Sequence, residues 1–291
     1  MTATSTAEIP RLESVAQLAQ RYRAWLCDIW GVMHDGVRPH ASAVDACKRF
    51  RDSGGVVVLL SNAPRPWQAV VAQLDRIGVS RDCYDAIVTS GDVARSMLEG
   101  AAAAKVFHLG PPRDRPLFEG LKVRFAGPDE ASCLVCTGLN DDETETPKDY
   151  AVILGQCHAL TLPMICANPD LMVERGDRLV FCAGALAAEY EAMGGQVTYA
   201  GKPHLPIYHR AFDTVSRIAG SNVAPAQVLA IGDGVKTDIA GAANAGIDAL
   251  FVGSKLHVSG DMADANAVSV LSSLFDRTAR LPVAMQFRLS W

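Results

Sequence analysis

The sequence has no long apolar run and no cluster of basic residues. No stretch approaches the ~20 apolar residues that cross a bilayer, which argues against a membrane-spanning helix. Residues 1–8 are small and polar, without the basic start and apolar core of a secretory signal, so we expect a cytoplasmic protein. The formal net charge of -5 argues against a nucleic-acid partner, because phosphate backbones are bound by clustered Lys and Arg.

Internal repeats and metal-binding cysteine patterns are missing as well. The 8 cysteines are scattered along the chain, as is typical of reduced, buried cysteines that act as small hydrophobic residues. Cys133 and Cys136 have the CxxC spacing, but they lie within an apolar, strand-like run and no second pair or histidine cluster accompanies them. The sequence therefore favours a core role over a metal or redox role for this pair.

By contrast, the chain has enough hydrophobic residues to form more than one hydrophobic core. The chain has 291 residues, of which 49% are hydrophobic and 20% charged, a composition typical of a globular protein. A chain of this length favours two domains. The sequence is compatible with a homodimer.

Short apolar runs alternate with amphipathic segments, which predicts an α/β fold of parallel strands joined by helices. The run 56–60, Val-Val-Val-Leu-Leu, is typical of a strand buried on both faces. Strands are expected at 24–27, 56–60, 85–89, 105–109, 121–125, 132–137, 164–167, 196–199, 228–231 and 248–252. Helices are expected at 41–52, 67–77, 150–160, 206–219, 239–245 and from 268 onward, while 281–291 has no assignable period.

Polar side chains follow four of these strands. They are Asp28, Ser61, Asn62, Lys202, Asp233 and Asp238. Because ligands of open α/β sheets bind off the carboxyl ends of the strands, we expect these side chains to converge. Five of the six also have a simpler explanation: a turn for Ser61 and Asn62, a surface position for Lys202, and helix capping for Asp28 and Asp233.

Gathered carboxylates repel one another unless a cation lies between them. Because the candidate ligands at these positions are carboxylate oxygens, Mg²⁺ is the most suitable cation. A lysine and a hydroxyl beside such a site can hold a phosphoryl group. Asp28 would then attack phosphorus and form an aspartyl phosphate, which predicts a small phosphorylated substrate.

Four short motifs carry these residues. They are Asp-x-x-Gly-Val from Asp28, Ser61-Asn62 after a strand, Gly-Lys-Pro from Gly201, and Gly-Asp-x-x-x-Thr-Asp from Gly232. Together they resemble the haloacid dehalogenase-like hydrolase superfamily. Within it the chain is similar to the branch that inserts a large α/β cap after the second motif and includes sugar, nucleotide and p-nitrophenyl phosphatases. Asn168-Pro169-Asp170 resembles a cap motif of that branch.

The resemblance implies a metal site and a nucleophile. Asp28 would be the nucleophile and a metal ligand, with the backbone carbonyl of Trp30 as a second ligand. Asp233 would bind Mg²⁺ directly, and Asp238 would support the metal site.

The resemblance also implies a phosphate site and a domain organisation. Ser61, Asn62 and Lys202 would hold the transferring phosphoryl group. A Rossmann-like parallel-sheet core would comprise 1–90 and 195–291, and the cap, at 91–194, would contact the substrate. Within the cap, the acidic loop 139–146 is either a selectivity element or a solvated face.

Trp30 departs from the pattern of the superfamily. Most of its phosphatases carry a second aspartate two residues after the nucleophile, as general acid and base. An indole only donates a hydrogen bond, and a positioned acid or base contributes ~10²–10⁴-fold in rate. Protonation of the leaving group and hydrolysis of the aspartyl phosphate should therefore both be slowed.

Four interpretations of Trp30 follow. His34 or Asp35 substitutes for the missing acid, although Asp35-Gly36 also predicts a simple turn. Alternatively, the substrates have good leaving groups, as aryl and acyl phosphates do. A third interpretation is a catalytically silent relative that binds phosphorylated ligands. The fourth is a dehalogenase, since related dehalogenases have a tyrosine at this position, although they work without a metal.

Overall fold

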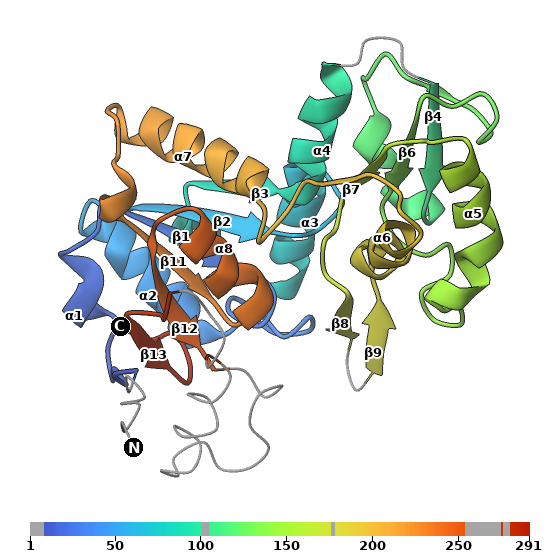
Figure 1. Ribbon diagram of the computed structural model, residues 1–291. Coiled ribbons are helices and arrows are strands. Elements are labelled where there is room, and N and C mark those ends of the chain that lie inside the picture. The colour runs from blue at the N-terminus through green and yellow to red at the C-terminus, as the bar shows by residue number, and fades with distance from the viewer. Residues whose placement is uncertain (1–8, 101–104, 176–177, 254–274, 276–279) are drawn as a thin grey trace, which may run out of the picture. The chain divides into compact units, whose positions relative to one another are not determined.

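The computed structural model describes residues 9–100, 105–175, 178–253, 275 and 280–291 (Figure 1). The chain divides into two compact units. Unit 1 consists of Met1–Leu59, Asp75–Ala86 and Ala211–Trp291, and unit 2 of Leu60–Leu74 and Ile87–Arg210. The division into a core and a cap at residues 91 and 194 stays a prediction. No helix in the described part of the chain has the length and apolar content needed to span a membrane.

The larger sheet has six strands in the order β13-β12-β11-β1-β2-β3. They are β1 (Ala24–Asp28), β2 (Val56–Ser61), β3 (Ala86–Thr89), β11 (Val228–Gly232), β12 (Asp248–Val252) and β13 (Ala284–Gln286). Strand β1 pairs in parallel with β11, where Cys27 lies opposite Ile231, and β11 pairs in parallel with β12. The order makes β11, β1 and β2 neighbours although they are far apart in the sequence.

The central strands carry apolar side chains on both faces, so they are stable where other elements cover both sides of the sheet. All residues of β1 and β11 are buried, as expected for inner strands of a covered parallel sheet. Helix α2 (Ala41–Asp52) packs Phe50 flat against Trp25 of β1, with ring centroids 3.9 Å apart. The predicted α/β fold is confirmed.

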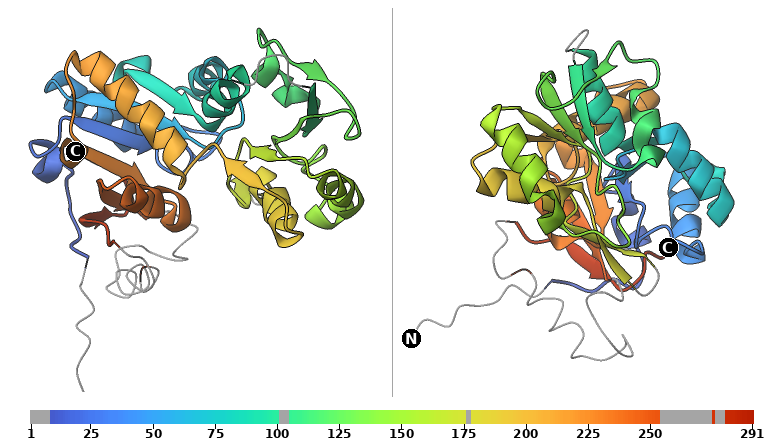
Figure 2. Two further views of the ribbon diagram at one scale, coloured as in Figure 1. Left: turned by 45° about the horizontal axis from the view of Figure 1, so that its top comes forward. Right: turned by 90° about the vertical axis from the view of Figure 1, so that its right-hand side faces the viewer.

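Unit 2 contains a second parallel sheet, with the order β10-β7-β6-β4-β5. Its strands are β4 (Lys105–Leu109), β5 (Arg124–Phe125), β6 (Cys133–Cys136), β7 (Met164–Cys166) and β10 (Val197–Tyr199). Helices α5 (Ala151–Ala159) and α6 (Ala183–Ala192) contact each other, and α6 also packs on β6 and β7 (Figures 1 and 2). Leu154, Leu186 and Tyr190 belong to the apolar core between them.

The remaining elements are short or connect the sheets. The helices are α1 (Ala16–Ala19), α3 (Trp67–Ile77), α4 (Ser90–Glu99), α7 (Leu205–Ala219) and α8 (Ala240–Asn244), and β8 (Met172–Arg175) pairs with β9 (Arg178–Phe181) as an antiparallel hairpin. Shorter helical turns occupy Arg81–Cys83, Pro112–Phe118, Pro147–Tyr150, Pro225–Gln227 and Val235–Ile239.

Several elements differ from the sequence prediction. The segment 281–291 has no period of its own, yet it supplies β13, which pairs in parallel with β12 and places Ala284 opposite Leu250. The sequence also predicts neither strand of the β8–β9 hairpin. The strand expected at 121–125 is reduced to β5, and the helix expected from 268 lies outside the described residues apart from isolated positions.

Candidate active site

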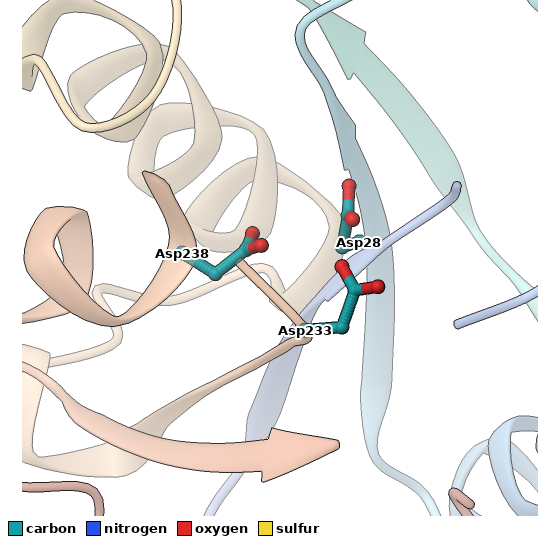
Figure 3. Close-up of side chains that lie close together, drawn as sticks. All are labelled: Asp28, Asp233 and Asp238. Atoms are coloured by element: carbon teal, nitrogen blue, oxygen red, sulfur yellow. The ribbon is translucent and has the colours of Figure 1, made fainter. Parts of the chain in front are cut away.

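Three aspartates of unit 1 bring their carboxylates together (Figure 3). Asp28 ends β1, Asp233 directly follows β11, and Asp238 lies in the helical turn Val235–Ile239 before α8. One oxygen of each carboxylate lies within 4.8 Å of an oxygen of both others. Asp28 is 8% exposed and Asp238 4% exposed. The structure thus gathers the three acids that the sequence assigns to a metal site.

Two glycines allow the backbone to approach these carboxylates closely. Gly31 has a φ of +85°, and a Cβ at this position would lie 2.2 Å from Oδ2 of Asp233. A Cβ at Gly232 would lie 2.1 Å from Cγ of Asp238. Both distances are too short for a real contact, so any larger residue at either position must displace a carboxylate.

The donor set of this cluster fits a hard divalent cation. Burial of neighbouring carboxylates is costly, and a cation between them removes the mutual repulsion. The ligand atoms are all oxygens, and Mg²⁺ takes oxygens at ~2.1 Å, which places opposite ligands ~4.2 Å apart. Asp238 is oriented by the backbone, because its Oδ2 accepts the N–H of Gly234 at 3.0 Å. Asp28, Asp233 and Asp238 are therefore the residues that could hold Mg²⁺.

Trp30 packs on the turn that follows it. The Trp30 ring packs edge to face against the His34 ring, with centroids 5.1 Å apart. A Cβ at Gly36 would lie 2.9 Å from Cη2 of Trp30. His34 is buried, its Nδ1 accepts the N–H of Gly36 at 2.9 Å, and burial lowers its pKa to about 4. Asp35 is exposed, and hydrogen bonds from two backbone N–H groups of the turn lower its pKa. The contacts of both side chains stabilise the turn, and neither contact identifies a residue that replaces the general acid and base expected at position 30.

Lys202 and Asn62 bind each other within unit 2. The N–H of Lys202 donates to Oδ1 of Asn62 at 2.7 Å, and Nδ2 of Asn62 donates to the Lys202 carbonyl at 3.1 Å. Nζ of Lys202 donates to the carbonyl of Leu60, near the end of β2, at 3.3 Å. Lys202 is 3% exposed, so it is no surface lysine. Ser61 accepts the N–H of Ala63 at 3.2 Å and so does take part in a turn.

Asp170 joins this pair, although the sequence assigns it only to a cap motif. Its Oδ1 accepts Nδ2 of Asn62 at 2.9 Å across a separation of 108 residues. The Asn-Pro-Asp motif marks the position in the sequence. Its partner could not be found from the sequence, because that contact depends on how the chain returns from β7.

The acidic loop and the cysteine pair form other contacts. Asp142 of the loop 139–146 accepts hydrogen bonds from both terminal nitrogens of Arg175 and is also paired with Arg113. Cys133 and Cys136 are free thiols, and burial raises the pKa of Cys136 to about 12.

Comparison with known proteins places these features in a family. A model described as haloacid dehalogenase-like hydrolase matches residues 25–124, and a second, HAD hydrolase-like, matches residues 199–276. A solved hydrolase of the haloacid dehalogenase-like family from Brucella suis 1330 is 43% identical, with a TM-score of 0.84, and the match covers 96% of this chain and 99% of that one.

Two more distant relatives are named for particular activities. The 5'-nucleotidase YutF of Bacillus subtilis (strain 168) is 25% identical over 249 residues, which cover 83% of this chain and 92% of the relative. The glycerol phosphate phosphatase Rv1692 of Mycobacterium tuberculosis, solved in complex with calcium, is 25% identical with a TM-score of 0.61. That match covers 81% of this chain and 67% of the phosphatase.

The resemblance drawn from four short motifs is therefore confirmed by matches over nearly the whole chain. The motif that begins at Asp28 lies within one matched segment, and those that begin at Gly201 and Gly232 lie within the other. The chain belongs to the haloacid dehalogenase-like hydrolase family.

Proposed function

We propose that the chain is a Mg²⁺-dependent phosphohydrolase that acts on a small phosphorylated metabolite through an aspartyl phosphate at Asp28. The carboxylate cluster of Asp28, Asp233 and Asp238 is the observation that carries this proposal. Two relatives are named as a 5'-nucleotidase and a glycerol phosphate phosphatase, which supports phosphate esters as the substrate class.

Asp28 is proposed to attack phosphorus with one carboxylate oxygen. The new O–P bond forms as the bond to the leaving oxygen breaks, and that oxygen departs as an alcohol once it gains a proton. Water then attacks the acyl phosphate, the bond between phosphorus and the Asp28 oxygen breaks, and inorganic phosphate leaves as the carboxylate is regenerated. Bound Mg²⁺ would neutralise charge on the phosphoryl oxygens and orient the group for in-line attack.

Lys202 and Ser61 are proposed to hold the phosphoryl group during this transfer. Burial of the Lys202 side chain beside the carbonyl of Leu60 supports the proposal, because it limits the positions that the ammonium can take. A lysine contributes a compact positive charge, which suits a phosphoryl group that carries several negative oxygens. Asn62 contacts the backbone of Lys202, so we propose that it contributes by holding that lysine.

Trp30 limits which substrates would be turned over well. An indole supplies no proton at neutral pH, so the leaving oxygen must depart with little help. Aryl and acyl phosphates need least protonation, and we propose that they react faster than alkyl phosphates. The contacts of His34 and Asp35 with their own turn support this preference.

The test is hydrolysis of p-nitrophenyl phosphate with Mg²⁺ and with EDTA, for the wild type and Asp28→Asn. We expect turnover that requires the metal and falls by at least ~10³-fold in Asp28→Asn, because the covalent route is then closed. Asp45→Asn, which changes an exposed carboxylate of α2, is the matched control and should retain full activity. Turnover without metal, or turnover unaffected by Asp28→Asn, would contradict the mechanism.

A silent phosphate-binding protein is the second candidate, and the position of Trp30 favours it. The indole packs against His34 and Gly36, on the turn that directly follows Asp28 and Ile29. Binding of inorganic phosphate without turnover of any phosphate ester would support this candidate over the enzyme.

A further inference from the structure

The side-chain amide of Asn62 is engaged at both ends. Nδ2 donates to Oδ1 of Asp170 at 2.9 Å and to the carbonyl of Lys202 at 3.1 Å. Oδ1 accepts the N–H of Lys202 at 2.7 Å. Asn62 is 5% exposed and Lys202 3% exposed, so water competes little for these hydrogen bonds. The amide thus connects Asp170 to both backbone polar groups of Lys202.

Asp170 determines the direction in which this amide points. A carboxylate only accepts hydrogen bonds, so it must face Nδ2 rather than Oδ1 of Asn62. In the reversed orientation two oxygens would face each other at the position of the 2.9 Å contact, and the N–H of Lys202 would face a donor. A hydrogen bond to a charged acceptor is also stronger than a neutral one. The carboxylate therefore selects the orientation that binds Lys202.

The surroundings of the amide leave little room for adjustment. A Cβ at Gly201 would lie 2.4 Å from Oδ1 of Asn62 and 2.8 Å from Oγ of Ser90, so the turn before Lys202 lies directly against the amide. Asp170 is itself held by its backbone. Its N–H donates to Oδ1 of Asn168 at 3.1 Å, and its carbonyl accepts the N–H of Gly184 at 3.1 Å.

We propose that Asp170 is a positioning residue for Lys202 and acts through Asn62. The inference rests on the proposed function of Lys202 as the residue that binds the phosphoryl group. Asp170 fixes the Asn62 amide, the amide fixes the backbone of Lys202, and that backbone sets where the ammonium lies. A shift of ~1 Å in a group that positions a substrate can cost ~10²-fold in rate.

The first experiment removes the carboxylate. Asp170→Ala should lower kcat/KM for p-nitrophenyl phosphate by ~10–100-fold and weaken the binding of inorganic phosphate, measured by calorimetric titration with Mg²⁺ present, by a similar factor. In a Lys202→Ala background the same change should have almost no further effect, because the lysine that Asp170 positions is gone. A merely structural role would instead give equal losses in both backgrounds, and that result would overturn the inference.

The second experiment exchanges the two side chains. Asn62→Asp alone places two carboxylates against each other and also removes the donor to the Lys202 carbonyl, so it should lose at least as much activity and phosphate binding as Asp170→Ala. Combining it with Asp170→Asn restores an amide–carboxylate pair and keeps the N–H of Lys202 bonded. The bond to the Lys202 carbonyl is absent from both variants, so the comparison isolates the restored pair, and at least ~10-fold should be recovered relative to Asn62→Asp. A double variant no better than Asn62→Asp would overturn the inference, even if Asp170→Ala fails to fold.

The control and the binding readout separate this inference from the proposed function. Asp129→Ala removes an exposed carboxylate of unit 2 and should leave both kcat/KM and phosphate binding unchanged. A wild type that binds phosphate but hydrolyses no phosphate ester would contradict the proposed phosphohydrolase activity. The phosphate titrations would then still test the role of Asp170. A wild type that binds no phosphate would overturn both.

Discussion

Replacing Gly31 by alanine should impair Mg²⁺ binding in addition to destabilising the fold. The alanine Cβ would lie 2.2 Å from Oδ2 of Asp233, so that carboxylate has to move. The left-handed backbone by itself costs a non-glycine residue about 1–2 kcal/mol. At a Mg²⁺ concentration ~100-fold above Kd, the ion stabilises the wild type by ~2.7 kcal/mol. A ~30-fold loss of affinity would reduce this increment to ~0.9 kcal/mol.

The free energy of unfolding in urea, with and without Mg²⁺, measures both effects. Gly54→Ala is the matched control, because Gly54 has a φ of +93° and its Cβ would meet no atom within 4 Å. It should lose the same about 1–2 kcal/mol and keep the full Mg²⁺ increment. An undiminished increment in Gly31→Ala would refute the inference that Asp233 is a ligand.

Two further predictions concern proton transfer and pH. Trp30→Asp restores a proton shuttle, so it should raise the turnover of alkyl phosphates more than that of aryl phosphates; equal effects would mean that this position is not the missing acid. Burial lowers the pKa of His108 from 6.5 to about 4, so the unfolded chain takes up this proton first as the pH falls. Relative to His108→Gln, the wild type should lose about 3 kcal/mol of unfolding free energy between pH 6.5 and 4 and nothing more below that. Urea unfolding across this range checks the prediction, and a constant difference between the two proteins would contradict it.

Most of the central sheet follows from the sequence. The runs at 24–27, 56–60 and 228–231 are apolar without alternation, and such runs are stable only as strands covered on both faces. The helices between them show the longer apolar period, and parallel strands need such crossovers. The ends of β1 and β11 could be predicted too, because Asp28 and Asp233 interrupt the apolar runs there.

Strands β13, β8 and β9 have no clear strand pattern in the sequence and form through pairing with other strands. Strand β13 has no periodic pattern of its own, and pairing with β12 makes it a strand. The hairpin of β8 and β9 is likewise absent from the sequence prediction, since its exposed apolar side chains, such as Met172 and Leu179, do not alternate as a half-buried strand would.

The candidate site likewise has features that follow from the sequence and features that depend on the tertiary structure. The sequence by itself determined which side chains are available: the acids at 28, 233 and 238, the lysine at 202, and a tryptophan where a proton donor is expected. Only the tertiary structure decided what each one contacts, including the hydrogen bond between Asn62 and Asp170 across 108 residues. The physical reason is that apolar periodicity reflects burial, which each segment encodes locally. Hydrogen-bond partners depend on where distant segments end in space.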